Sequence, residues 1–292
     1  MKYLGLEFYK LKRKKIILMT FLFAAVEIMW CIVNSNRAIT RNPDMLGGFE
    51  YSYMLMSFAS LNGLFFPILI SIITSRISDI EHKGDTWKLL KSSVTSLNSI
   101  YLSKFLCSAI LVSIPVLMQV LSIVLFGHFR GVIESISVSL LLKYTLGTIL
   151  VSIAIIALHL WIATVIPNQM IAITFGMIGS FIGLTSGLFY QGIRRLFIWS
   201  YYLELSPLSY AYDNVLGSSV YRIDMNFSIT ILVFLIGMLI YYIGRNHLLK
   251  KKYRRDLNVK EVSLGRNSKV KKFFYMVCII SFATYKCVDW FW

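Results

Sequence analysis

Long apolar runs constrain the fold of this chain more than any other feature of its sequence. They lie near residues 16–33, 52–74, 105–126, 142–166, 170–189 and 228–244. A helix needs about 20 apolar residues to cross a bilayer, and in lipid the backbone must satisfy its own hydrogen bonds. Because none of the runs alternates like a strand, the sequence predicts an all-α, polytopic membrane protein with six transmembrane helices.

Composition supports a membrane protein and argues against a nucleic-acid-binding one. Only 15% of residues are charged, whereas soluble domains have about a quarter. The net charge of +16 comes from basic residues that flank the apolar runs, so anionic lipid at the cytoplasmic surface is the expected electrostatic partner and nucleic acid is not. The four cysteines form no C-x-x-C pair, and we expect neither a disulfide framework nor a zinc site.

The distribution of Lys and Arg predicts the orientation. The first apolar run is too long for a signal peptide and has no cleavage site after it, so we expect an uncleaved first span. With the N-terminus inside, the inner segments hold 22 basic residues and the outer segments hold 6. The positive-inside rule therefore places the N-terminus in the cytoplasm.

The C-terminal part leaves two alternatives open. Residues 273–285 form an apolar run of thirteen residues, about 20 Å long as a helix and too short for a simple crossing. The segment is either a seventh crossing or a helix at the membrane interface. We divide the chain into a transmembrane domain, 1–250, and a basic cytoplasmic tail with a C-terminal hydrophobic segment, 251–292.

No motif in the sequence indicates an enzyme. It contains no P-loop, no H-E-x-x-H and no G-x-S-x-G. Two ionisable residues within the apolar runs are candidates for a role, Glu27 and His159. Each is either an intramembrane contact for a substrate or proton or a hydrogen-bonded packing residue between helices, and the packing interpretation is favoured for both.

The outer segment 190–227 is long and aromatic, which predicts a short amphipathic or re-entrant element at the interface. It either contacts substrate, as an outer gate, or only seals the outer face. The gate residues would be Trp199, Tyr201, Tyr202 and Pro207.

The inner stretch SDIEHKGDTWKLLK, residues 78–91, is one of the few polar passages. As a helix it would place Ile77, Ile80, Gly84 and Trp87 on one side. Such a helix either fits a groove on a soluble partner or lies on the lipid surface, and the spacing alone favours the lipid surface.

The run IEHKGDTWKLLKSSVTSLNSIYLSKF resembles the loop after the second span of ABC-2 type permeases. Its E-x-x-x-x-x-W-K form, from Glu81 to Trp87 and Lys88, is most similar to the lantibiotic-immunity and bacitracin-resistance branch. The six spans, the basic N-terminus EFYKLKRKK and the long outer segment agree over residues 1–250, whereas the tail beyond 250 departs from the usual ending of the family.

The resemblance implies a permease subunit of an ATP-driven exporter in the cell membrane of a bacterium. The implied cargo is an amphipathic peptide or lipid-like antibiotic, and its removal would give immunity or resistance. ATP and Mg would bind a separate ATP-binding subunit, so this chain would hold no cofactor, and a second permease of the same or a related sequence would complete the assembly. Composition and resemblance together suggest a Gram-positive source.

The resemblance also makes the inner stretch a coupling helix, with Trp87 as its aromatic anchor and charged residues at its rim. The residues implied in coupling are Ile80, Glu81, Lys83, Gly84, Trp87 and Lys88.

The alternative function is that of a membrane immunity or scaffold protein that binds a peptide or signalling partner without ATP.

Overall fold

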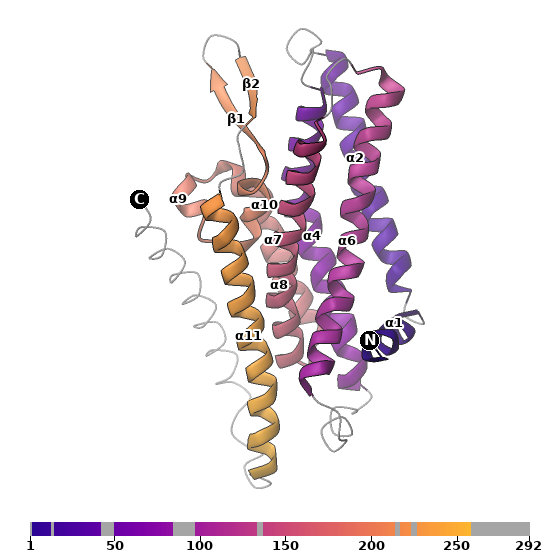
Figure 1. The fold of residues 1–292 in the computed structure, drawn as a ribbon, viewed down its shortest axis with the longest axis vertical. Helices are drawn as coiled ribbons and strands as arrows, with labels where there is room; N and C mark the ends of the chain where they lie inside the picture. Colours follow the sequence, from indigo (N-terminus) through magenta and orange to yellow (C-terminus); the bar gives the residue numbers. More distant parts are fainter. Residues whose placement is uncertain are drawn as a thin grey trace.

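The computed structural model describes residues 2–12, 15–41, 50–83, 97–132, 137–213, 217–222 and 227–257. Within these residues six helices are long and apolar enough to cross a membrane, which confirms the predicted all-helical membrane fold. They run side by side along the long axis of the molecule (Figure 1). These helices are α2 (Ile16–Arg41), α4 (Glu50–Lys83), α6 (Leu97–Arg130), α7 (Val138–Val165), α8 (Gln169–Thr185) and α11 (Phe227–Leu257).

Most of these helices are longer than the apolar runs that predicted them. Helices α4 and α6 have 34 residues each, about 51 Å at 1.5 Å per residue, whereas the hydrocarbon core is about 30 Å thick. Hydropathy detects only the part of a helix in hydrocarbon, so the predicted spans were correctly placed but, except for the one that became α8, too short. We call the end of the bundle that carries the N-terminus the inner end, following the predicted orientation.

Helices α4 and α7 form the centre of the bundle. The most apolar stretch of each is 61% and 78% buried, against 33% or less for the other four spans. Their contact builds the main core, in which Phe66 and Ile70 of α4 belong to one cluster with Val151 and Ile155 of α7. The outer helices expose large apolar side chains such as Leu22, which suits a surface covered by lipid.

Helices α4 and α8 cross in backbone contact at two glycines. A Cβ added to Gly63 would lie 2.8 Å from the carbonyl carbon and oxygen of Gly183, and one on Gly183 would overlap the Gly63 carbonyl. Pro67, four residues after Gly63, has no N–H to donate to that carbonyl. Small residues let membrane helices approach this closely, so the crossing depends on both glycines.

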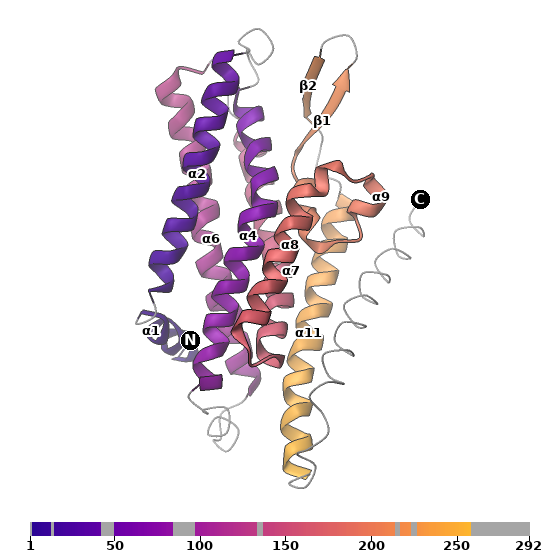
Figure 2. The ribbon, with the colours of Figure 1, turned by 180° about the vertical axis from the view of Figure 1, so that it is seen from behind.

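A separate helix, α1 (Lys2–Lys12), lies beside the inner end of the bundle (Figures 1 and 2). The sequence analysis treated this stretch only as a basic flank of the first span. Lys15, between α1 and α2, has a φ of 54°, a left-handed conformation that turns the chain. Glu7 and Leu11 of α1 are buried, so α1 packs onto the bundle through one face.

The outer segment after α8 has no long helix. Figure 2 shows its short helical turns beside the outer end of α8, where the sequence predicted an amphipathic or re-entrant element. An antiparallel hairpin follows, with strands β1 (Leu208–Asp213) and β2 (Gly217–Arg222); it was not predicted and is the one sheet among the described residues. The turns are η1 (Ser186–Leu188), α9 (Gln191–Arg194), η2 (Ile198–Ser200) and α10 (Tyr201–Glu204).

Candidate functional site

Four charged side chains form a closed ring at the inner end of the bundle. This inner charge ring consists of Glu7 and Lys10 of α1, Glu81 of α4 and Lys104 of α6. The Nζ of Lys10 lies 2.9 Å from Oε1 of Glu7 and 3.0 Å from Oε1 of Glu81. The Nζ of Lys104 lies 3.2 Å from Oε2 of Glu7 and also pairs with Oε2 of Glu81. Each lysine contacts both carboxylates, so the ring has no net charge.

Three members of the ring are buried. The exposed side-chain fraction is 0% for Lys104, 1% for Glu81 and 4% for Glu7. Lys104 also donates a hydrogen bond of 3.1 Å to the Ile77 carbonyl oxygen, so the three donors of its ammonium group all have acceptors. Removing one partner of a buried ion pair costs about 3–5 kcal/mol, because the other charge is left uncompensated. The ring therefore acts as a single connection between α1, α4 and α6.

Lys10 is the exposed member of the ring, with 36% of its side chain accessible. Partial burial lowers its pKa, but the hydrogen bond to Glu7 and the attraction of both carboxylates outweigh this effect and raise the pKa above the usual 10.5. Solvent screens a pair at this exposure, so Lys10 is the weaker link between α1 and the bundle.

The ring connects the two helices that precede and follow segment 84–96 in the sequence. Glu81 lies two residues before the end of α4, and Lys104 lies seven residues after the beginning of α6. The ring therefore joins the inner ends of α4 and α6 to each other. Because Glu7 belongs to the same ring, α1 is joined to them as well.

Three of the six residues implied in coupling are described by the structure. Ile80 is half-buried and packs against the main core, and Glu81 turns inward into the ring. Lys83 is 73% exposed and forms an ion pair of 2.8 Å with Asp79, one turn earlier. Gly84, Trp87 and Lys88 lie outside the described residues, and the coupling role of all six stays a prediction.

The sequence analysis missed Glu7, Lys10 and Lys104. Glu7 is the single acidic residue in the basic stretch 1–15, and Lys104 is a charged residue directly before an apolar run. These two irregularities were the available signals, but they are 97 residues apart, and no local pattern indicates that they meet.

A second connection joins the inner end of α4 to the inner end of α7. Nε2 of His82 lies 3.1 Å from the carbonyl oxygen of Ala163 in α7. Asp79, Ser75 and Gln169 line a shallow notch beside this contact. Helix α4 is therefore attached to α1 and α6 through the inner charge ring and to α7 through His82.

A polar triad connects three spans deeper in the membrane. Asn62 of α4 donates to the hydroxyl of Tyr144 in α7 at 2.9 Å, and this hydroxyl donates to Oε1 of Gln119 in α6 at 2.9 Å. Gln119 closes the triad by donating to Oδ1 of Asn62 at 2.8 Å. Glu27 of α2 is 2% exposed and interacts with Gln119. It therefore lies between helices, and its proposed contact with substrate or proton remains a prediction.

Two of the four predicted gate residues, Trp199 and Tyr202, contact α7. Nε1 of Trp199 donates to Nε2 of His159 at 3.4 Å, so two residues that the sequence analysis considered separately are in contact. The hydroxyls of Tyr202 and Ser152 lie 2.9 Å apart. The hydroxyl of Tyr201 donates to the Arg195 carbonyl at 2.7 Å, and burial raises the pKa of both tyrosines, which keeps them protonated. Pro207 is also buried.

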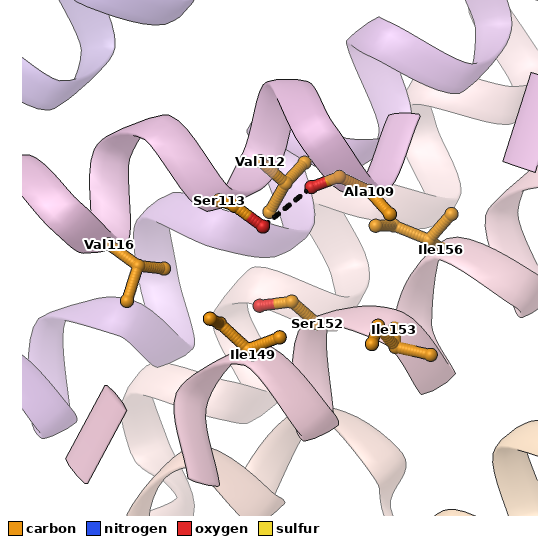
Figure 3. Close-up of a pocket in the computed structure, with 8 residues that line it drawn as sticks. All are labelled: Ala109, Val112, Ser113, Val116, Ile149, Ser152, Ile153 and Ile156. Atoms are coloured by element: carbon orange, nitrogen blue, oxygen red, sulfur yellow. Dashed lines mark hydrogen bonds between the residues drawn. The ribbon is translucent and has the colours of Figure 1, made fainter. Parts of the chain in front are cut away.

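A small hollow lies next to this contact, between α6 and α7 (Figure 3). Ser113 and Val116 of α6 face Ile149 and Ser152 of α7 across it. Pro115, in the same stretch of α6, has no N–H for the helix ladder. The two helices are thus less tightly packed near the Tyr202 contact.

Among the residues that the structure describes, no group of three or more His, Cys, Asp and Glu side chains could hold a metal ion.

Comparison with known proteins identifies one family. The model of the family described as ABC-2 family transporter protein matches residues 3–183, which is more than half of the chain. This range includes the whole inner charge ring and the polar triad. Neither the curated proteins nor the solved structures give a match.

Proposed function

The chain belongs to the ABC-2 family of transporter proteins, and from this premise we propose that it is the permease subunit of an ATP-driven exporter for an amphipathic peptide or lipid-like antibiotic. Removal of such a molecule from the membrane would give immunity or resistance. ATP and Mg would bind a separate ATP-binding subunit, and a second permease, identical or related, would complete the assembly in the membrane of a Gram-positive bacterium.

The inner charge ring is the observation that supports this function. An exporter whose ATPase is a separate subunit needs a device that passes movement from a cytoplasmic segment to membrane helices. Segment 84–96 is bounded by Glu81 and Lys104, which the ring joins to each other and to α1. The segment is therefore mechanically connected to three helices.

The mechanism follows from this connection. Closure of the ATP-binding partner would push on segment 84–96, and the ring would move the inner ends of α1, α4 and α6 together. Both α4 and α6 contain a proline near mid-helix, Pro67 and Pro115, where the hydrogen-bond ladder is interrupted and bending is easier. The movement would favour the state that releases cargo outward, provided that this state binds the cargo more weakly.

The choice of cargo rests on the similarity of the E-x-x-x-x-x-W-K stretch to permeases of lantibiotic immunity and bacitracin resistance. An amphipathic molecule dissolved in the membrane can reach this bundle from the lipid side, where α2, α6, α8 and α11 expose apolar faces.

A purification experiment tests the partner. The tagged chain would be isolated in mild detergent, as wild type and as Trp87→Ala, and accompanying proteins identified by mass spectrometry. We expect a P-loop ATPase with the wild type and its loss with Trp87→Ala, since buried aromatic anchors dominate many interfaces. Trp30→Ala is the matched control, because Trp30 is 58% exposed on α2, away from the inner end. If no ATPase accompanies the wild type, the exporter assignment is wrong and an ATP-independent immunity or scaffold protein becomes the better interpretation.

A further inference from the structure

Glu27 lies near the middle of helix α2. It follows the beginning of α2 by eleven residues, about 16 Å along the helix axis. Its side chain does not face lipid: the residue is 2% exposed, whereas Val26 and Met29 on the other face are 49% and 63% exposed. The carboxyl group is thus directed into the packing of α2 against α4 and α6.

The groups around Glu27 carry no charge that could balance a carboxylate. Its Oε1 is buried and has no hydrogen-bond partner. Gln119 of α6 is the side chain that hydrogen-bonds Glu27, and Asn62 of α4 is linked to Gln119 through the polar triad. The titratable groups that interact with it are a thiol and two phenols, those of Cys31, Tyr144 and Tyr202. All three are neutral at physiological pH, and no described Lys or Arg pairs with Glu27.

An ionised carboxylate in such a place is very costly. Without a cation or a full set of donors, a buried charge loses several kcal/mol or more of hydration free energy, and the group neutralises instead. A protonated carboxyl group has no charge, and its O–H can donate to a neighbouring oxygen. The triad consists of uncharged amide and hydroxyl groups, so it offers Glu27 dipoles but no counter-charge.

We infer that Glu27 is a proton-binding residue of this protein, protonated when α2 is packed on α4 and α6 and able to release the proton when this seam opens to water. The face of α2 that packs on the bundle suits such opening, because its buried residues are small or polar. They are Thr20, Ala24, Glu27, Cys31 and Ser35, together with Ile16 at the inner end.

Proton uptake would then accompany the closing of the seam. Any conformational change that separates α2 from Gln119 would release a proton, so that low pH favours the packed arrangement and high pH favours the open one. This inference goes beyond the proposed function: it requires neither ATP nor any particular cargo, and the ligand is the proton itself.

Infrared spectroscopy tests the inference directly. The full chain in lipid nanodiscs at neutral pH would be compared with Glu27→Gln, and with Glu204→Gln as control, since Glu204 pairs with Arg194 and Arg195. We expect a carbonyl band of a protonated carboxyl group in the wild type, its loss in Glu27→Gln and its retention in Glu204→Gln. An unchanged band in Glu27→Gln, or no such band in the wild type, would overturn the inference.

Thermal unfolding gives a second, independent measurement. If the folded state holds one proton that the unfolded state releases, raising the pH above neutral should increase the unfolding equilibrium constant of the wild type about tenfold per pH unit relative to Glu27→Gln. Parallel pH profiles would contradict the inference. Failure of Glu27→Gln to fold would also contradict it, because an amide has nearly the shape of a protonated carboxyl group and is likewise uncharged.

Discussion

Glu81 and Lys104 form an ion pair with side chains that are 1% and 0% exposed, although 23 residues separate them in the sequence. The pair spans the base of segment 84–96 and joins the inner ends of α4 and α6. A buried pair of this kind is seldom the most stable solution, since apolar residues of similar volume often serve as well. What it supplies here is a fixed connection between two helices and, through Glu7, a third.

Breaking this pair should destabilise the protein strongly and non-additively. In Lys104→Met, two buried carboxylates would share Lys10 alone, and we expect a loss of about 3–5 kcal/mol. Glu81→Gln should be costly for the same reason, whereas Glu81→Gln with Lys104→Met leaves the balanced pair of Glu7 and Lys10. The double variant should therefore lose less than the sum of the single losses, by about 0.5–3 kcal/mol. Thermal unfolding in detergent measures all three, and strict additivity would show that the two residues do not interact.

The attachment of α1 to the bundle should weaken at alkaline pH, because Lys10 then loses its charge. Its pKa is raised in the folded state, so the stability that charged Lys10 contributes is fully present below the usual value of 10.5 and is lost as the pH rises through the raised value. The thermal unfolding temperature of the wild type should fall over this range more steeply than that of Lys10→Met. Lys15→Met, at the exposed bend before α2, serves as control and should behave like the wild type.

The glycine crossing of α4 and α8 gives a prediction about packing. In Gly183→Ala the new methyl group would overlap the Gly63 carbonyl oxygen, and backbone cannot move aside as a flexible side chain can. We expect a loss of about 1–3 kcal/mol, typical of overpacked cores. Gly187→Ala is the matched control, because its Cβ would have one neighbour at an ordinary 3.6 Å, the Cδ2 of Leu203. Equal melting temperatures for the two variants would mean that the helices are not in backbone contact.

Part of this architecture could be predicted from the sequence, for a clear physical reason. Lipid forces each crossing segment to be a long apolar helix, so run length alone located α2 and α7. The inner charge ring, the polar triad and the Gly63–Gly183 crossing each join residues from separate helices. Periodicity reports which side of one helix is polar, but it carries no information about which other helix lies opposite.

Helix α1 and the hairpin were missed for different reasons. Helix α1 is short and basic, so it gives no long apolar run that hydropathy could detect. Its contact with the bundle depends on two buried side chains, those of Glu7 and Leu11. The hairpin lies in an aromatic outer segment where apolar residues suggested a membrane-surface element instead of strands. Glu27 and His159 were recognised as unusual, but their partners Gln119 and Trp199 became visible only in the folded chain.

The contact between Tyr202 and Ser152 tests how firmly the outer segment is attached to α7. Tyr202→Phe keeps the ring and removes the hydrogen bond of 2.9 Å, which should cost about 1 kcal/mol. The Ser152 hydroxyl keeps its own hydrogen bond of 2.7 Å to the Thr148 carbonyl oxygen. Tyr190→Phe, at a side chain that is 81% exposed, should have no effect on the melting temperature. If the two changes are equivalent, the outer segment does not rest on α7 through this hydroxyl.

Coupling through the inner charge ring can be separated from partner binding with one pair of variants. The double change Glu81→Gln and Lys104→Met removes the connection between α4 and α6 without leaving an unpaired charge, whereas segment 84–96, which would dock on the ATPase, keeps its sequence. We expect the double variant to bind the ATPase as the wild type does and to lose most of its protection of cells against a lantibiotic, because movement of the segment no longer reaches both helices. Lys104→Arg, which keeps the charge, should retain more protection than the double variant. If the double variant protects cells fully at wild-type abundance, then α4 and α6 receive the movement by another route, and the ring serves folding alone.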